Sequence, residues 1–95
     1  MIKTGTFEIE ESFYITGRGI VVLGYLNDFI PKVGMSISIN ILDKIEVFKI
    51  IGTSMGNRPK NNKEQFSVLI QTTPEMTKYI SENKITNQLA TILSD

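Results

Sequence analysis

The stretch from Gly5 to Ile39 constrains the fold more than any other part of the sequence. It contains three apolar-rich segments separated by two turns, Gly17-Arg18-Gly19 and Pro31-Lys32-Val33-Gly34. Alternation of apolar and polar residues is typical of a strand with one buried face. Glycine and proline mark the places where a chain turns. The stretch therefore predicts three strands joined by short connections.

The first of these segments, Thr6–Thr16, carries apolar residues at alternate positions: Phe7, Ile9, Phe13 and Ile15. We expect these four side chains to face inward, with Ser12 and Tyr14 facing outward. Glu11 falls on the apolar parity, and a buried carboxylate without a partner is costly. A bend or strand end is therefore expected at Glu11.

The next two segments differ in pattern. Gly19–Leu26 is apolar on both parities, with Ile20, Val22 and Leu26 on one side and Val21, Leu23 and Tyr25 on the other. Such a strand either is covered on both faces or presents an apolar outer surface. In Met35–Leu42 every second residue is apolar, which defines the inward face of a third strand.

The second half of the sequence continues the strand pattern with one interruption. A link at Asp43–Lys44 leads to a β-branched run, Ile45–Ile51, whose phase shifts near Val47-Phe48 and indicates a bulge. Residues Gly52–Gln65 show no periodicity and are rich in Gly, Asn, Pro and Lys, which predicts a long flexible loop. Phe66–Ile70 alternates again and predicts a further strand.

Pro74–Asn83 is the helical candidate. Proline suits the first turn of a helix, and Met76, Tyr79 and Ile80 fall on one side, so one or two turns are expected. Asn83 is expected to end the helix with a left-handed backbone. A last strand is expected over Ile85–Leu93.

These elements predict an all-β protein: one domain over residues 1–95, folded as a small closed antiparallel barrel of about six strands with one short helical turn. Closure would remove exposed strand edges. The interior is expected to be packed by the following side chains: Phe7, Ile9, Val22, Ile37, Ile39 and Val68.

Composition excludes several kinds of chemistry. The chain has 95 residues, no cysteine, no histidine and a formal net charge of zero. Disulfides, zinc–thiolate and iron–sulfur sites are excluded, and the usual general base is missing. We therefore expect no catalysis, cofactor or metal. Zero net charge argues against non-specific binding of long nucleic acid. No apolar run is long enough for a membrane helix, and the N-terminus lacks a secretory signal, so a cytoplasmic location is expected.

Several short motifs resemble a known family. They are Phe7-Glu8-Ile9-Glu10, the run from Phe13 to Val22 with its Gly17-Arg18-Gly19 corner, Gly24, Ile30 and Lys32-Val33-Gly34. Their order is similar to that in the second domain of the translational GTPases, the β-barrel that follows the G domain in elongation factor Tu. The resemblance implies a stand-alone barrel without the G domain. The chain has no Gly-x-x-x-x-Gly-Lys-Ser/Thr motif, so nucleotide binding is not expected.

Three residues depart from that family's pattern. Leu23 and Tyr25 stand where a small polar and then a basic residue are usual, and Phe29 replaces the turn glycine. Aromatic and aliphatic residues dominate protein interfaces. These three side chains either form a protein-binding patch or are covered by the chain's own loop or helical turn, and we weigh the two equally. The leading hypothesis is a non-enzymatic cytoplasmic module that binds a protein partner, for example as a bacterial immunity or antitoxin protein.

Two other hypotheses remain open at this point. An RNA- or ribosome-associated protein, as the resemblance implies for its relatives, would use the available cations: Arg18, Lys32, Arg58, Lys60 and Lys63. The structural alternative is that the Gly-Arg-Gly segment forms a barrel corner and that the loop cations are simply solvated. In that case Glu8, Glu10 and Glu11 are solvated surface carboxylates as well. The third hypothesis is a subunit that completes an active site in a larger assembly.

Overall fold

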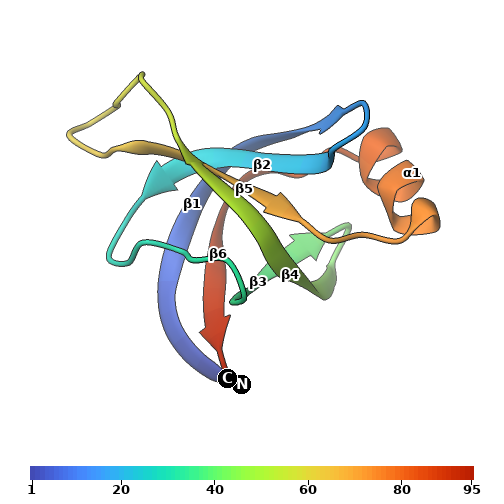
Figure 1. Cartoon of the computed structure of the whole chain (residues 1–95), viewed down its shortest axis with the longest axis horizontal. Helices are drawn as coiled ribbons and strands as arrows, with labels where there is room; N and C mark the ends of the chain where they lie inside the picture. Colours follow the sequence, from blue (N-terminus) through green and yellow to red (C-terminus); the bar gives the residue numbers. More distant parts are fainter.

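The chain folds into a closed six-stranded barrel with one helix at an end (Figure 1). The computed structural model describes residues 1–95, except for the side chain of Thr86. In chain order the elements are β1 (Ile2–Ile15), β2 (Gly19–Leu26), β3 (Ser36–Ile41), β4 (Lys44–Met55), β5 (Gln65–Ile70), α1 (Pro74–Glu82) and β6 (Thr86–Ser94).

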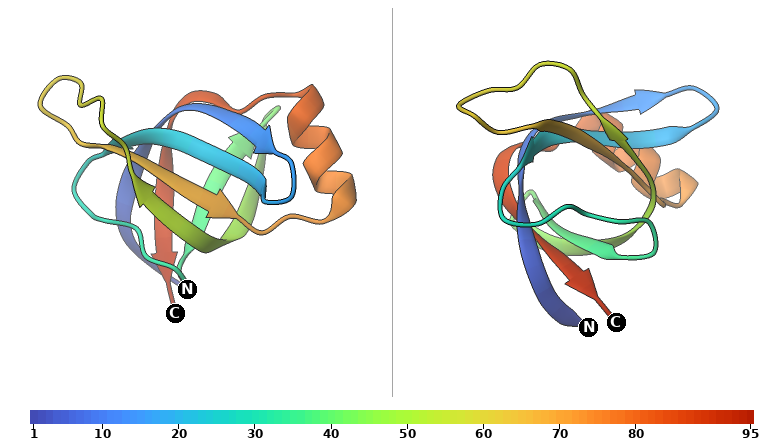
Figure 2. Two further views of the ribbon diagram at one scale, coloured as in Figure 1. Left: turned by 45° about the horizontal axis from the view of Figure 1, so that its top comes forward. Right: turned by 60° about the vertical axis from the view of Figure 1, so that its left-hand side comes forward.

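Neighbouring strands pair antiparallel in the order β1-β2-β5-β4-β3-β6, and β6 returns to β1 (Figure 2). The predicted all-β class and closed antiparallel barrel are therefore confirmed. No helix among the described residues has the length and apolar character that crossing a bilayer requires.

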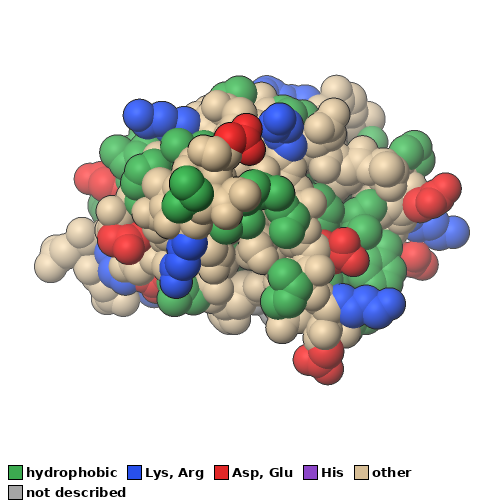
Figure 3. All heavy atoms as spheres, turned by 90° about the horizontal axis from the view of Figure 1, so that it is seen from below, with side chains coloured by type: hydrophobic (Ala, Val, Ile, Leu, Met, Phe, Trp, Pro, Cys, Tyr) green, Lys and Arg blue, Asp and Glu red, His purple; other side chains and the backbone are tan. Residues whose placement is uncertain are grey.

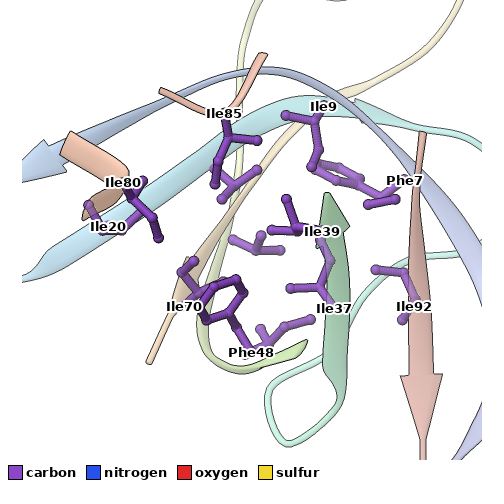
Figure 4. Packing of buried hydrophobic residues seen from close by; sticks show 14 of the residues in the cluster. Phe7, Ile9, Ile20, Ile37, Ile39, Phe48, Ile70, Ile80, Ile85 and Ile92 are labelled. Atoms are coloured by element: carbon purple, nitrogen blue, oxygen red, sulfur yellow. The ribbon is translucent and has the colours of Figure 1, made fainter. Parts of the chain in front are cut away.

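Apolar side chains from all six strands fill the interior of the barrel and point toward one another (Figure 4). The six residues predicted to pack there are all buried, with exposed fractions of 3% or less. The rings of Phe7 and Phe66 meet edge to face, with centroids 6.2 Å apart. Because this interior is already filled, any recognition by the molecule takes place on its outer surface.

Helix α1 closes one end of the barrel. Thr73 caps its start by accepting a hydrogen bond from the Met76 N–H (3.2 Å), and Pro74 occupies the first turn as predicted. Ile80 is buried, and Met76 and Tyr79 pack against the core. The helix has nine residues, longer than one or two turns. Asn83 ends it with φ −128°, so the predicted left-handed backbone is wrong.

A bulge in β1 reverses the facing of its last residues. The pairing with β2 shifts register between Ile9 and Glu11, which confirms the irregularity expected there. The strand nevertheless continues, with its phase inverted by the extra residue. Ser12 is buried (3% exposed), whereas Phe13 and Ile15 are 37% and 36% exposed. The prediction that Phe13 and Ile15 face inward is therefore wrong.

The corner between β1 and β2 is a tight turn. The Arg18 N–H donates to the Ile15 carbonyl (2.9 Å), and Gly17 has φ +81°, the value a type II turn requires at its third residue. Further along β2, a side chain at Gly24 would collide with the Glu8 carbonyl. Glycine at that position lets β2 approach β1 closely beside the bulge.

The hairpin between β3 and β4 turns at Leu42-Asp43, one residue earlier than expected, with φ of +49° and +67°. In β4 the bulge lies between Ile50 and Gly52, in the pairing with β5, and not near Val47-Phe48. The run before it alternates regularly, so Ile45 and Val47 face outward.

The predicted loop over Gly52–Gln65 is partly strand. β4 continues through Met55 and pairs with β5, and residues 56–64 form a protruding connection that we call the arm. Near its tip the backbones of Lys60 and Lys63 exchange hydrogen bonds of 3.0 and 2.9 Å around Asn61-Asn62, both of which have positive φ. The arm and α1 lie at opposite ends of the molecule (Figures 1 and 2).

Candidate binding surface

A hollow of about 300 Å³ with a mixed apolar and hydroxyl lining lies on the outer face of β1, β2, β5 and β4. We call it the hollow. It is lined by Phe13, Ile15, Arg18, Val21, Leu23, Gly52, Thr53, Ser54, Ser67 and Leu69. Its apolar members come from three strands, because both parities of β2 are apolar and the bulge turns the end of β1 outward.

Strand register brings these side chains together. Val21 lies opposite Phe13 of β1 on one side and opposite Leu69 of β5 on the other. Directly opposed residues in antiparallel strands project to the same face, so the three side chains form a row across the hollow. Gly52 of β4 lies opposite Leu69 and has no side chain, and a Cβ there would come 3.2 Å from the Leu69 Cβ. The missing side chain keeps this end of the hollow open.

Arg18 lies at one end of the hollow. Its backbone is fixed by the type II turn, its side chain is exposed, and it takes part in neither of the two ion pairs found among the described side chains. Glu11 lies toward the other end, because it is opposite Leu23, two pairs further along β1 and β2 than Val21. Arg18 therefore lines one end of the hollow, and Glu11 lies beyond the lining residues, toward the other end.

The three residues predicted as a protein-binding patch occupy three different surroundings. Leu23 lines the hollow. Tyr25 lines a separate pocket of about 180 Å³ whose walls include Lys60 and Lys63 of the arm. Phe29 packs against the core, beside Gly5. Phe29 is thus partly covered by the chain itself, whereas Leu23 and Tyr25 are both partly exposed and line separate hollows of the outer surface.

Tyr25 interacts with the acidic side of β1. Its hydroxyl donates to the Glu10 carboxylate (3.3 Å). Desolvation raises the pKa of Tyr25, and the negative charge of Glu10 raises it further. The phenol therefore stays protonated at neutral pH and acts as a hydrogen-bond donor.

Two of the predicted RNA-contacting lysines are paired within the molecule. Lys63 contacts the Glu8 carboxylate and also donates to the Asn27 side chain (3.3 Å), and Lys60 lies 3.8 Å from Glu10. Because these side chains are partly exposed, each pair contributes at most about 1 kcal/mol. Glu8 and Glu10, which we expected to be solvated, hold the arm against the barrel.

The remaining cations are dispersed. Arg18 lies at the corner near α1, whereas Arg58 lies in the arm at the opposite end (Figure 1). Lys32 lies in the connection between β2 and β3. On the face shown in Figure 3, basic and acidic side chains are interspersed. The five cations proposed for RNA contact therefore do not form one continuous surface.

Sequence reasoning missed Phe13, Ile15 and Leu69 as members of the hollow. The available signal was Glu11 on the apolar parity, which marks the bulge that turns Phe13 and Ile15 outward.

No grouping of three or more acidic side chains suited to a metal ion occurs among the described residues.

The chain is a small closed β-barrel with a filled interior and a hollow on its outer face. Over 50 residues, 53% of the chain, the sequence is 42% identical to elongation factor Tu of the apicoplast of Theileria parva. The chain spans only 12% of that protein's length. No protein-family model and no solved structure matches the chain. The similarity and the closed six-stranded antiparallel barrel together fit a stand-alone barrel like domain 2 of elongation factor Tu.

Proposed function

We propose that this protein is a non-enzymatic cytoplasmic binding module that recognises a protein partner through the hollow. The observation that carries the proposal is the row of Phe13, Val21 and Leu69 on the outer face of a barrel whose interior is already filled. Apolar and aromatic side chains gathered in one concave place are what protein interfaces use as anchors. Leu23, predicted from the sequence, belongs to this surface.

The arrangement of charge supports a protein partner. Nucleic acid is bound mainly by several cations that neutralise successive phosphates. Here Lys60 and Lys63 already neutralise Glu10 and Glu8, and Arg18 is the one cation that lines the hollow. A partly apolar surface with a single cation favours a protein segment over a polyanion.

A bacterial immunity or antitoxin protein is the concrete form of this proposal. Such a protein would shelter a toxin's surface or imitate a translation factor that the toxin uses. The similarity to elongation factor Tu supports the second mode, because imitation requires a matching surface. This form predicts that the partner is a toxin that recognises translation factors.

The experiment is affinity capture from the source cytoplasm, with and without ribonuclease, followed by measurement of the affinity of each captured partner for variants. Leu23→Ser should weaken binding by at least about tenfold, as truncation of a central apolar contact does. Leu89→Ser is the matched control, since Leu89 is an exposed leucine on β6 outside the hollow. Equal affinity of wild type and Leu23→Ser for every partner would contradict the proposal.

The second candidate function is an RNA- or ribosome-associated accessory protein. It is favoured by the similarity to elongation factor Tu and by Arg18, which has no ion-pair partner among the described side chains. In that case binding would be lost after ribonuclease treatment, and affinity would fall steeply with added salt. Charge reversal at Arg58 and Lys32 would then weaken binding more than Leu23→Ser does.

A further inference from the structure

We propose that the hollow receives a bulky apolar side chain of the partner protein and that Arg18 pairs with a carboxylate immediately beside that side chain. This inference rests on the proposed function and specifies the chemistry of the partner. The recognised element is a short segment in which an aromatic or large aliphatic residue adjoins aspartate or glutamate.

The floor of the hollow favours an apolar side chain in the partner. Val21 is 9% exposed and forms this floor, and Phe13 and Leu23 are more exposed beside it. The Ser67 hydroxyl, at the margin, donates to the Ser54 carbonyl (3.4 Å), so it is engaged within the protein. A volume of about 300 Å³ lined in this way suits one large apolar side chain better than a polar group.

The position of Arg18 favours a carboxylate in the partner. The turn that carries it is fixed by the Ile15 carbonyl and by Gly17, so the guanidinium starts from a defined point on the backbone. Arg18 lines both the hollow and an adjoining groove that contains Tyr14, Gln71 and Thr72. An arginine fork binds a carboxylate in a two-point contact, and this one has no carboxylate partner among the described side chains.

The two ends of the hollow determine where the partner's carboxylate lies. None of the residues that line the hollow is acidic, so a carboxylate placed near Arg18 meets no opposing charge from the lining. Glu11 lies toward the far end, opposite Leu23, where it would repel a second carboxylate. The acidic residue of the partner must therefore lie on the side of β1 and β2 that carries the Gly17-Arg18-Gly19 corner.

The test uses defined peptides and amide NMR of the full chain. Three capped hexapeptides are titrated: one with phenylalanine followed by aspartate, one with asparagine in place of the aspartate, and one with serine in place of the phenylalanine. Adenosine monophosphate and a mixed-sequence RNA hexamer are titrated in parallel. The phenylalanine–aspartate peptide should shift the amide signals of Val21, Leu23 and Leu69.

The asparagine peptide should bind about three- to fivefold more weakly, the effect expected for one partly exposed ion pair. The variant Arg18→Gln should abolish that difference, whereas Lys32→Gln, an exposed cation outside the hollow, should preserve it. The serine peptide should produce no shift in the hollow. Both variants replace exposed side chains, so the fold is expected to survive and the spectrum verifies it directly.

Equal binding of the aspartate and asparagine peptides would overturn the inference and leave the proposed function standing, since the hollow would still bind an apolar side chain. Shifts in the hollow caused by the nucleotide or the RNA at lower concentration than by any peptide would overturn both. If no probe shifts the hollow, the inference fails, and the Leu23→Ser measurement decides the proposed function separately.

Discussion

The side-chain amide of Gln88 pairs with the backbone of Asn40 as a residue of a neighbouring strand would. The Asn40 N–H donates to Gln88 Oε1 (2.9 Å), and Gln88 Nε2 donates to the Asn40 carbonyl (2.9 Å). The backbones of β3 and β6 pair over only three residues, Ser36–Ser38. The Gln88 side chain therefore extends the pairing of β3 with β6, which we call the seam, beyond the last backbone pair.

Removing this amide should loosen the seam. Gln88→Ala is expected to lower the free energy of unfolding by about 1 kcal/mol, the usual contribution of such hydrogen bonds. Hydrogen exchange at the Asn40 amide should become faster. Gln88→Glu should give a free energy of unfolding and an exchange rate between those of wild type and Gln88→Ala. A carboxylate accepts from the Asn40 N–H but cannot donate to the Asn40 carbonyl. Asn87→Ala is the control, and equal exchange rates in all variants would contradict the assignment.

Ser12→Ala tests the buried serine that the bulge turns inward. The Ser12 hydroxyl accepts a hydrogen bond from the Ile85 N–H (3.0 Å) in the interior, just after α1. In Ser12→Ala the buried Ile85 N–H has no hydrogen-bond partner, which should lower the free energy of unfolding by about 1 to 3 kcal/mol. Chemical denaturation measures the change. Ser36→Ala, on the outer face of β3, should change stability by less than about 0.5 kcal/mol.

The regular positions of the fold could be predicted from the sequence because alternation and strand phase agree there. Ile37, Ile39 and Ile41 lie in a strand without a bulge, so every second residue faces the interior. The phase of Phe13 and Ile15 could not be predicted, because it depends on how many residues the bulge at Glu11 inserts. The extension of β4 through Met55 depends on pairing with β5, which local composition does not reveal.

The turn between β3 and β4 should be improved by substitution. Leu42 and Asp43 both have positive φ, as a type I′ hairpin requires, but leucine disfavours that conformation by about 1 to 2 kcal/mol. The double variant Leu42→Asn/Asp43→Gly should therefore raise the free energy of unfolding by about 1 kcal/mol. Leu42 is 64% exposed, so little packing is lost. An unchanged or lower midpoint in thermal unfolding would contradict the turn assignment.

Protonation of Asp28 in acid should lower the stability of the fold. Its carboxylate accepts hydrogen bonds from the Thr6 N–H (2.9 Å) and the Thr6 hydroxyl (3.0 Å), and these lower the pKa of Asp28 below its ordinary value of 3.8. A group whose pKa is lower in the folded state stabilises the fold at pH values above the unfolded pKa. That stabilisation is lost as the pH falls through the folded pKa.

The measurement compares wild type with Asp28→Asn between pH 7 and pH 2. The difference in the free energy of unfolding should be constant well above pH 3.8 and should shrink below it. Asparagine keeps an acceptor oxygen but does not titrate, so it is the matched control. A difference that grows on acidification would show that Asp28 is not held by Thr6.

A double-mutant cycle tests how the arm is held. Glu8→Gln and Lys63→Gln, alone and together, should give a coupling free energy of at most about 1 kcal/mol, because the pair is partly exposed. Added salt should reduce the coupling. Both single variants should speed amide exchange at positions 60 and 63, whose backbones pair in the arm. Zero coupling at low salt would show that the contact does not fix the arm.

The candidate surface was less predictable than the fold. Leu23 could be named because both parities of β2 are apolar. Its neighbours could not, since Leu69 joins it only through the register of β5 on β2. Tyr25 has the same facing as Leu23, but Lys60 and Lys63 of the arm join it in a separate pocket. Contacts between segments distant in sequence decide which outward apolar residues share one surface.

The bulge in β1 makes the facing of the last strand residues independent of the length of the strand. Ser12 lies opposite Val22 and Phe13 opposite Val21, so deleting Glu10, the extra residue of the bulge, would restore regular pairing with β2, with Ser12 still inward and Phe13 still outward. The deletion would therefore leave the hollow in place. Loss or gain of one codon here is thus a change that the outer surface of this barrel should tolerate.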